Sequence, residues 1–447
     1  MNQKQYFSAM GLDGQKKVVI IGNGISGITT ARHLRKKTSY SIVVISEETP
    51  YFFSRTALMY VYMGHLKFEH TKPYEDNFWK KNKINLIQQR VDQVNLKDRS
   101  LILEDQTTLS YDFLIIATGS APKRLHCPGE DLNAVQCFYH KKDLSLLESW
   151  TPSINTAVVV GGGLIGIELA EMLHSRGKKV HFLIRESSFW NQVLATEESE
   201  IINQHLKNKG IILHFSTELM GIKGNEEERV CGIKTSQDTE IKCEWLGLAI
   251  GVTPNIQFLK NSGLAINKGI QVNPYLETTI PGVYAVGDCA ELLDPPAGRS
   301  AVESIWYTGR IMGETVAQTL AGKKTIYNPG PWFNSAKFFD IEYQTYGSVA
   351  ANPDPEKEAQ FFWRKANKNC SIRLSYHPKN STFLGIVSLG VRLRHELFDQ
   401  WLKKKWPVEE VVKNLKYAFF DPEFSPNYAD DIEQSWNSKN KRHESIN

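Results

Sequence analysis

The sequence is poor in cysteine, and its thiols follow no recognisable pattern. Its 447 residues include six cysteines, at positions 127, 137, 231, 243, 289 and 370, without C-x-x-C spacing. Disulfide frameworks and zinc sites need closely and regularly spaced cysteines. We therefore expect a reduced, cytoplasmic protein whose thiols are mostly buried and which binds no metal ion.

Long apolar runs and a large excess of one charge are also absent. No stretch reaches the roughly eighteen apolar residues that a membrane span needs, and the first residues lack the basic and then apolar pattern of a signal peptide. Lys and Arg number 53 against 49 Asp and Glu, which gives a net charge of +4. Because no basic block is long enough for a nucleic-acid footprint, we expect no nucleic-acid partner.

The chain does contain glycine-rich turns that follow short apolar runs. Residues 18–21 suit a buried parallel strand, and Gly22, Gly24 and Gly27 follow them in the G-x-G-x-x-G spacing that opens a helix. A second apolar run ends just before Glu47, about twenty residues past Gly27, where the fingerprint has its ribose ligand. This pattern predicts a bound dinucleotide whose pyrophosphate lies at a helix N-terminus.

The same pattern recurs in the middle of the chain. Residues 157–160 are apolar, and Gly161, Gly163 and Gly166 repeat the glycine spacing. One such motif is weak evidence, whereas two, each in a strand, turn and helix context, predict two dinucleotide-binding folds. The chain length agrees, because a single hydrophobic core rarely grows to this size.

Three further motifs resemble those of a known family. Tyr-Ala-Val-Gly-Asp ends at Gly287 and Asp288, Ala-Thr-Gly contains Thr118 and Gly119, and Leu-Ala-Ile-Gly-Val-Thr-Pro-Asn contains Gly251. With the two glycine motifs they resemble the two-dinucleotide-binding-domain flavoproteins of the pyridine nucleotide-disulfide oxidoreductase superfamily. The resemblance implies that Asp288 binds the ribityl chain of FAD.

The resemblance also implies the fold, an α/β protein with two Rossmann-like domains, for FAD and NAD(P), and a C-terminal α+β domain. The expected FAD-binding domain comprises residues 1–120 and 247–328, the NAD(P)-binding domain residues 121–246, and the C-terminal interface domain residues 329–447. The expected FAD-binding residues are Gly22, Gly24, Gly27, Glu47, Arg55, Thr118, Gly119, Gly251, Gly287 and Asp288. Those for the nicotinamide coenzyme are Gly161, Gly163, Gly166 and Arg185.

The segment after the first glycine motif distinguishes branches of this superfamily. Arg55 matches the Arg of a Pro-Tyr-x-Arg pattern in rubredoxin reductase-like and nitrite reductase-like members, which implies pairing with the FAD pyrophosphate. The alternative is an ordinary solvated arginine. Members that reduce disulfides carry cysteines here, whereas residues 50–80 contain none. We therefore expect electrons to leave the flavin directly, and the residue that contacts flavin N5 stays open.

The choice of coenzyme depends on the end of the second strand of the second motif. Leu-Ile-Arg, ending at Arg185, resembles the NADPH-using glutathione reductase pattern, whereas Glu186 could equally bind the ribose of NADH. We favour NADPH slightly. Glu168 matches a family glutamate close to the nicotinamide and is the expected catalytic residue, with a helix-surface carboxylate as the alternative.

The resemblance implies an enzyme, an FAD-dependent NAD(P)H oxidoreductase, but leaves its electron acceptor open. Oxygen, a quinone and a small iron–sulfur protein are the candidates. Residues 391–406 are basic and amphipathic, which allows a membrane-surface helix, although a docked helix with a solvated basic face is the simpler interpretation. A redox-sensing protein resembling apoptosis-inducing factor, and a homodimer, are further alternatives.

Overall fold

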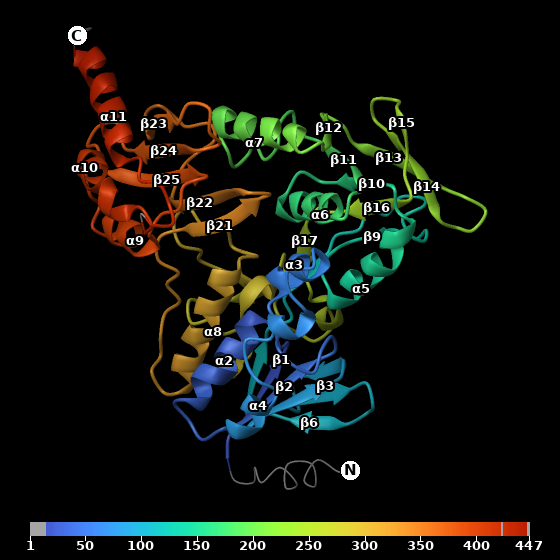
Figure 1. The fold of residues 1–447 in the computed structure, drawn as a ribbon. Helices are drawn as coiled ribbons and strands as arrows, with labels where there is room; N and C mark the ends of the chain where they lie inside the picture. The colour runs from blue at the N-terminus through green and yellow to red at the C-terminus, as the bar shows by residue number, and fades with distance from the viewer. Residues whose placement is uncertain (1–14, 422, 445–447) are drawn as a thin grey trace. The chain divides into compact units, whose positions relative to one another are not determined.

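The chain folds into two compact units, each assembled from separate segments (Figure 1). The structure is a computed structural model that describes residues 15–421 and 423–444. Unit 1 contains residues up to 123 together with 139–148 and 251–329, and unit 2 contains 124–138, 149–250 and the residues from 330 onward. The predicted α/β class with two Rossmann-like sheets is confirmed, since each unit holds a five-stranded parallel sheet.

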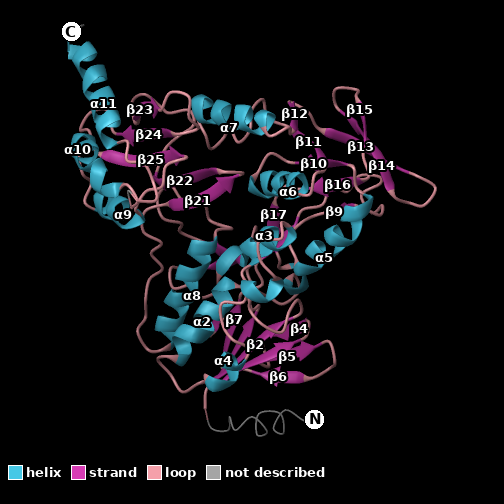
Figure 2. Cartoon of the chain, in the orientation of Figure 1, coloured by secondary structure: helices cyan, strands magenta, loops and turns pink. Residues whose placement is uncertain are grey.

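The sheet of unit 1 has the strand order β19-β7-β1-β2-β3. Its strands are β1 (Lys17–Ile21), β2 (Ser41–Ser46), β3 (Ile84–Gln88), β7 (Phe113–Ile116) and β19 (Val283–Ala285). Val18, Val19 and Ile20 are fully buried because helices cover the sheet, as expected for parallel strands that are apolar on both faces. Helices α2 (Ile25–Arg35) and α8 (Trp306–Leu320) pack side by side in this unit (Figure 2).

The remaining elements of unit 1 are short. Its other strands are β4 (Val91–Asn95), β5 (Ser100–Leu103), β6 (Thr108–Ser110), β8 (Ser120–Pro122), β17 (Val252–Pro254), β18 (Ile270–Val272) and β20 (Ala290–Leu292). Its other helices are α3 (Leu58–Tyr62), α4 (Asn77–Lys81) and most of α5 (Lys141–Trp150). Strand β8 pairs with β17, so the segments that leave and re-enter unit 1 are held together.

The parallel sheet of unit 2 has the order β12-β11-β10-β16-β9. Its strands are β9 (Val135–Gln136), β10 (Thr156–Val160), β11 (Lys179–Ile184), β12 (Ile212–Phe215) and β16 (Trp245–Leu248). A separate antiparallel sheet contains β13 (Leu219–Gly224), β14 (Val230–Thr235) and β15 (Glu240–Lys242). Helices α6 (Leu164–Ser175) and α7 (Thr196–Asn208) complete this part.

The C-terminal residues form an antiparallel sheet with helices beside it. The strands are β21 (Phe333–Phe338), β22 (Ile341–Gly347), β23 (Ala359–Arg364), β24 (Ser371–Tyr376) and β25 (Phe383–Leu389), and the helices are α9 (His395–Lys403), α10 (Val408–Ala418) and α11 (Ala429–Glu444). This region has its own apolar core, yet it groups with the second parallel sheet in unit 2. The division into three domains at the expected boundaries stays a prediction.

Buried ion pairs fasten the C-terminal sheet to α7. Arg373 of β24 is 6% exposed and contacts Glu198, which is 1% exposed, with nitrogen to oxygen distances of 2.8 and 2.9 Å. Its guanidinium also donates to Glu197 at 2.7 Å. Nearby, His205 of α7 lies 2.7 Å from the carboxylate of Asp340. The C-terminal segment therefore completes the charge pairing of α7.

Helix α9 falls within the basic segment 391–406, and its contacts show which side of this segment is buried in the protein. Phe398 and Trp401 are buried in the C-terminal core, where Phe398 stacks on Tyr346 with ring centroids 5.0 Å apart. The apolar face of the helix is thus covered by its own unit, as in the simpler interpretation. Within the described residues, no helix has the length and apolar character to cross a membrane.

Candidate functional site

The first glycine motif forms a tight turn between β1 and α2. The N–H of Gly22 donates to the carbonyl of Ile45 at 2.7 Å, and Gly22 has a φ of +110°. A Cβ atom on Gly22 would lie 2.1 Å from the carbonyl oxygen of Ala117, and one on Gly27 would lie 2.1 Å from the oxygen of Gly22. Both positions need glycine because the backbone passes too closely for a side chain.

Gly24 differs from these two glycines, because open space surrounds it. A Cβ atom there would meet nothing within 4 Å, although Gly24 is the residue before the first turn of α2. The first turn of α2 contains no acidic residue. Its N–H groups and its partial positive charge can therefore receive an anionic group, which is the arrangement that a dinucleotide pyrophosphate requires. The residues present fit the FAD that the motif predicts.

Asp288 lies in the same unit, in the turn that follows β19. The hydroxyl of Ser120 donates to its Oδ2 at 2.8 Å, and burial raises the pKa of the Asp288 carboxyl. A Cβ atom on Gly287 would lie 2.3 Å from the hydroxyl oxygen of Ser26 in α2. The fold thus brings the Asp288 turn against the helix of the first glycine motif, although the two are far apart in sequence.

The two other motifs of unit 1 are joined to each other by hydrogen bonds to backbone carbonyls. The hydroxyl of Thr118 donates to the carbonyl of Asn255 at 2.8 Å, and the N–H of Asn255 donates to the carbonyl of Gly119 at 2.9 Å. The N–H of Lys123 donates to the carbonyl of Gly251 at 3.0 Å. The turns that contain Gly22, Thr118 and Asp288 therefore follow β1, β7 and β19, which are neighbouring strands of the sheet.

Glu47 and Arg55 lie on the chain that leaves β2. Glu47 is exposed directly past the strand end, as the ribose prediction requires. Arg55 makes a bidentate pair with Glu48, with distances of 3.1 and 2.5 Å, and donates to the carbonyl of Tyr139 at 2.6 Å. Its hydrogen bonds are thus directed to Glu48 and Tyr139, and its contact with a pyrophosphate stays a prediction.

The residues around Arg55 were not predicted from the sequence. The N–H of Lys141 donates to the carboxylate of Glu48 at 2.8 Å. Burial raises the pKa of Glu48, but its hydrogen bonds with His140, Arg55 and Lys141 outweigh burial and lower that pKa to about 2. Tyr139 stacks on the guanidinium of Arg55, 4.7 Å from its ring centroid, and burial raises the pKa of its hydroxyl. Residues 139–148, which lie within the range expected for the NAD(P)-binding domain, are grouped with unit 1.

Unit 2 repeats the geometry of the glycine turn. Gly161 has a φ of +116°, and a Cβ atom on it would lie 2.3 Å from the carbonyl oxygen of Ala249. On Gly166 a Cβ atom would lie 2.0 Å from the oxygen of Gly161, whereas around Gly163, which precedes α6, there is open space. The two turns match glycine for glycine, so unit 2 offers a second dinucleotide site.

The residues expected to recognise the nicotinamide coenzyme are less strongly constrained. Arg185 directly follows β11, is highly exposed, and lies 3.1 Å from the carboxylate of Glu186. Glu168 is half-buried on α6, and burial together with the charge of Glu171 raises the pKa of Glu168 to about 7. A carboxyl with this pKa can hold or release a proton near neutral pH.

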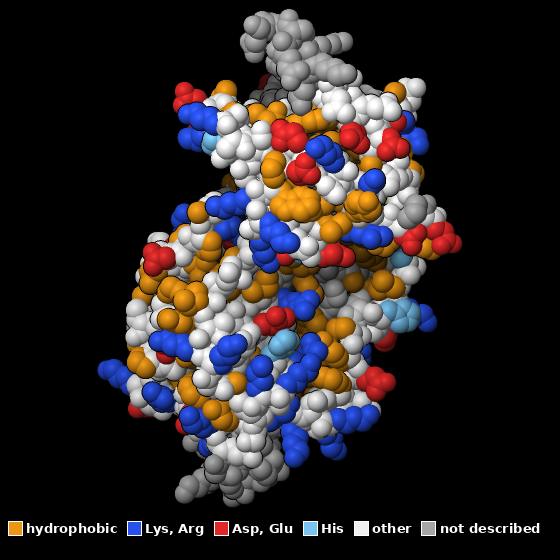
Figure 3. All heavy atoms as spheres, turned by 90° about the vertical axis from the view of Figure 1, so that its left-hand side faces the viewer, with side chains coloured by type: hydrophobic (Ala, Val, Ile, Leu, Met, Phe, Trp, Pro, Cys, Tyr) orange, Lys and Arg blue, Asp and Glu red, His pale blue; other side chains and the backbone are white. Residues whose placement is uncertain are grey.

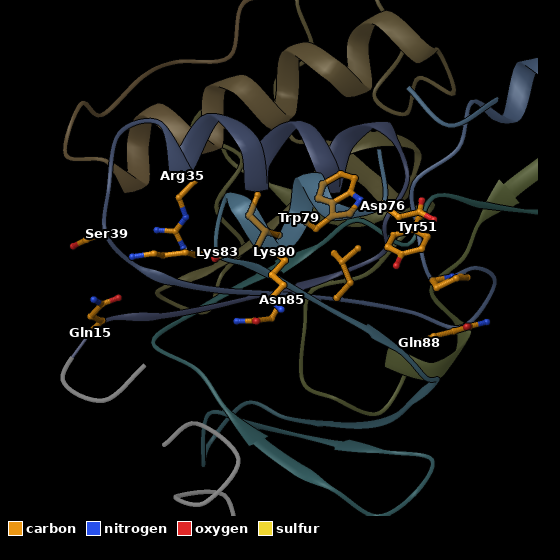
Figure 4. A pocket seen from close by; sticks show the side chains of 13 residues that line it. Gln15, Arg35, Ser39, Tyr51, Asp76, Trp79, Lys80, Lys83, Asn85 and Gln88 are labelled. Atoms are coloured by element: carbon orange, nitrogen blue, oxygen red, sulfur yellow. Dashed lines mark hydrogen bonds between the residues drawn. The ribbon is translucent and has the colours of Figure 1, made fainter. Parts of the chain in front are cut away.

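A separate cavity of about 820 Å³ opens in unit 1 beside the edge strand β3 (Figure 4). Arg35, Lys80 and Lys83 line it, and the one carboxylate among the described lining residues, that of Asp76, is paired with Lys72 at 2.7 Å. None of the predicted site residues lines the described part of this cavity. Nor does any group of three His, Cys, Asp or Glu residues in the described ranges have the arrangement of a metal site.

Comparison with known proteins identifies the family. The family model described as pyridine nucleotide-disulphide oxidoreductase matches residues 16–319. The chain is 29% identical over 281 residues to the nitrite reductase [NAD(P)H] of Bacillus subtilis, covering 62% of this chain and 35% of that protein. It is 28% identical over 341 residues to the ferredoxin reductase subunit of a 5,5'-dehydrodivanillate O-demethylase from Sphingobium, covering 75% and 82%.

The solved structures agree on the fold. A NAD-dependent persulfide reductase from A. fulgidus has a TM-score of 0.84 at 21% identity, covering 96% of this chain and 84% of that one.

The chain spans about a third of the length of the two Bacillus subtilis relatives, 35% and 36%. Because the family model matches more than half of the chain, the chain belongs to the pyridine nucleotide-disulphide oxidoreductase family.

Proposed function

We propose that this protein is an FAD-dependent NAD(P)H oxidoreductase that passes electrons to its acceptor without a cysteine relay. The observation that carries the proposal concerns the thiols of unit 1. Residues 50–80 contain no cysteine, and the single cysteine of unit 1, Cys289, is fully buried. Its thiol donates to the carbonyls of Ile116 at 3.3 Å and Val286 at 3.4 Å, and burial raises its pKa. Unit 1 contains no second cysteine with which Cys289 could form a relay disulfide, so this thiol serves in packing.

The residues of unit 1 have separate roles in this proposal. When bound, FAD supplies the acceptance of a hydride from the nicotinamide coenzyme and the release of electrons to a second acceptor. The turn of Gly22, Gly24 and Gly27 binds the pyrophosphate, Glu47 binds the ribose, and Asp288 binds the ribityl chain. Ser120 orients the Asp288 carboxylate through its hydrogen bond of 2.8 Å.

The residues of unit 2 bind the coenzyme. Gly161, Gly163 and Gly166 form the second pyrophosphate turn, and Arg185, exposed at the end of β11, pairs with the 2′-phosphate of NADPH. Its only described carboxylate partner is the neighbouring Glu186 at 3.1 Å, which the phosphate would displace. NADPH is therefore favoured over NADH. Glu168, whose pKa is about 7, holds a proton near the reacting end of the coenzyme.

A small acidic iron–sulfur protein is the acceptor class that we favour. The Sphingobium relative is named as a ferredoxin reductase subunit. Lys and Arg side chains gather on the face that carries α2 and α8 (Figure 3), where α2 has Arg32 and Arg35 in its last turn and Lys36 and Lys37 follow it exposed. An acidic partner complements such a face. The apolar face of α9 is buried in the core of its own unit and is not free to bind a membrane surface, which argues against a membrane-bound quinone as the acceptor.

Stopped-flow kinetics with the intact protein test this proposal. The FAD-loaded protein is reduced anaerobically with NADPH and mixed separately with a ferredoxin, a rubredoxin, a quinone, oxygen and a disulfide. The iron–sulfur proteins should be reduced fastest, and their rates should fall as salt is added, because salt screens the attraction between exposed charges. The double variant Lys36→Glu, Lys37→Glu should slow this step, whereas Lys234→Glu in unit 2 should not. If the disulfide were the acceptor reduced fastest, the proposal that electrons pass to the acceptor without a cysteine relay would be refuted.

A further inference from the structure

Two of the six cysteines face each other across neighbouring strands of unit 2. Strands β14 and β15 pair antiparallel with Gly232 opposite Lys242 and Ile233 opposite Ile241. Continuing this register by one position brings Cys231 opposite Cys243, and the N–H of Cys243 donates to the carbonyl of Cys231 at 3.3 Å. Side chains at directly opposed positions project from the same face of a sheet. The two thiols are therefore neighbours.

The distance across such a pair suits a disulfide. Cα atoms of a hydrogen-bonded antiparallel pair are about 5.5 Å apart, and disulfides are found at Cα separations of about 4.4–6.8 Å. In the structure both residues are free thiols, and the thiol of Cys231 lies 3.5 Å from the carbonyl oxygen of Lys223 on β13. Closing the bond thus requires rotation of the Cys231 side chain, with no change in strand register.

The two thiols differ in accessibility in a way that defines an order of reaction. Cys231 is exposed, whereas Cys243 is 1% exposed. Burial, the charge of Glu244 and the charge of Cys231 together raise the pKa of Cys243 to about 12. Solvent reaches Cys231 first, and once its sulfur is bonded it no longer carries a charge that opposes ionisation of Cys243.

We propose that Cys231 and Cys243 form a reversible redox pair that a low-molecular-weight disulfide such as oxidised glutathione converts to an intramolecular disulfide. The thiolate of Cys231 attacks the reagent, the reagent's S–S bond breaks, and one thiol leaves with the proton of Cys231. The sulfur of Cys243 then attacks the sulfur of Cys231 and releases the second thiol, which takes the proton of Cys243. Two protein thiols are oxidised, and one disulfide is reduced to two thiols.

The position of Cys243 connects this pair to the coenzyme-binding sheet. Glu244 follows it, and the carboxylate of Glu244 accepts hydrogen bonds from the N–H groups of Asn155 and Thr156 at 3.1 and 2.7 Å. Trp245 then begins β16, which pairs with β10, the strand that enters the Gly161 turn. A covalent link at Cys243 would therefore restrain the edge from which β16 begins, without touching the glycine turn itself.

Peptide mapping of the intact, FAD-loaded protein tests the proposal. The protein is incubated with oxidised glutathione, remaining thiols are alkylated, and the unreduced digest is analysed by mass spectrometry. We expect a linked peptide that contains Cys231 and Cys243, that disappears after dithiothreitol treatment, and that still forms in Cys370→Ser, a half-buried thiol elsewhere in unit 2. Cys231→Ser should leave Cys243 unmodified, and Cys243→Ser should stop the reaction with glutathione still attached to Cys231.

Two results of the peptide mapping would overturn the redox pair. One is a wild-type protein in which glutathione stays on Cys231 while Cys243 remains a free thiol after unfolding. The other is a wild-type protein in which neither thiol reacts. A second measurement guards against variants that fold poorly, because oxidation should raise the melting temperature of the wild-type protein reversibly, and an unchanged melting temperature with a linked peptide found only after denaturation would also refute the proposal.

Discussion

The hydroxyl of Ser120 donates to the carboxylate of Asp288 at 2.8 Å across 168 positions of sequence. The contact joins the segment that leaves unit 1 to the turn in which the predicted ribityl ligand lies. Since burial raises the pKa of Asp288, the Ser120 hydrogen bond is one of the contacts that favour its ionised form. The properties of Asp288 therefore depend on a residue that the motif does not include.

Asp288→Ala should greatly weaken FAD binding. A hydrogen bond to a charged group contributes about 1.5–3 kcal/mol, so we expect the affinity for FAD to fall by roughly 10- to 150-fold. The measurement is FAD content and fluorescence titration of the apoprotein. Ser120→Ala should cause a smaller loss, because it leaves the carboxylate in place. Full FAD occupancy in Asp288→Ala at dilute protein concentration would show that Asp288 does not bind the flavin.

Arg185→Ala should change the preference between coenzymes. If Arg185 pairs with the 2′-phosphate, its loss should weaken NADPH by about 1.5–3 kcal/mol and leave NADH nearly unchanged. The ratio of kcat/KM values for the two coenzymes measures this difference. Arg176→Ala, at the far end of α6, serves as a control that should leave the ratio unchanged. Equal losses for both coenzymes in Arg185→Ala would mean that the arginine does not distinguish them.

Anaerobic titration with NADPH should reduce the flavin completely with one equivalent. A redox-active disulfide beside the flavin would consume a second equivalent, and residues 50–80 contain no cysteine that could form one. Cys289→Ser should keep both this stoichiometry and the turnover rate, because the buried thiol makes only hydrogen bonds that a hydroxyl can replace and has no second cysteine in unit 1 to pair with. A requirement for two equivalents, or loss of turnover in Cys289→Ser with FAD still bound, would mean that a thiol takes part.

The stability of the protein should carry a contribution from Glu168 that depends on pH. The folded protein holds this proton up to a pKa of about 7, whereas an unfolded glutamate titrates near 4.3. The contribution of Glu168 is therefore present below about pH 4 and is lost as the pH rises through about 7, with a total on the order of 3–4 kcal/mol. Glu168→Gln should flatten this part of the pH profile of chemical unfolding.

The exposed Glu148 of α5 provides the matched control for this experiment. Glu148→Gln should keep the pH dependence of the wild-type protein. A profile for Glu168→Gln that coincides with the wild-type profile between about pH 4 and 7 would contradict the raised pKa.

Arg373→Met should destabilise unit 2 strongly. The substitution leaves the carboxylate of Glu198 buried without its partner, which typically costs about 3–5 kcal/mol. Chemical unfolding followed by tryptophan fluorescence measures the loss. The double variant Arg373→Met, Glu198→Leu should recover most of it, because no buried charge is then left unpaired. If the double variant were no more stable than the single one, the ion pair would not be the cause.

The sequence was sufficient for the parts of the site that depend on the backbone. Gly22 and Gly161 are placed by the near approach of Ala117 and Ala249, and only glycine satisfies that geometry at either turn. The two glycine turns repeat wherever a strand, a tight turn and a helix bind a pyrophosphate, so their spacing alone predicts them. Asp288 was expected from the resemblance of its motif to the family, and its binding of FAD stays a prediction.

The contacts of Arg55 could not be predicted in the same way. Its partners are Glu48, seven positions earlier, and the carbonyl of Tyr139, which the fold brings in from 84 positions away. Nothing in the local pattern around Tyr139 indicates that it joins unit 1, because the segment 139–148 has no motif and its assignment depends on tertiary packing. The role of Arg185 was ambiguous for a different reason. If the predicted end of the strand is wrong by one residue, Glu186 takes the position that selects the coenzyme in place of Arg185.

The pairing of Arg373 with Glu198 also sets an order of events during synthesis. The two residues are 175 positions apart, so a ribosome that adds roughly 5 to 20 residues per second makes the carboxylate about 9 to 35 s before its guanidinium partner. For that interval the carboxylate of Glu198 has neither its guanidinium partner nor the C-terminal strand that carries it. The side of α7 that faces the C-terminal sheet is therefore completed only after Arg373 has been made, and a chain released earlier leaves Glu198 without this ion pair.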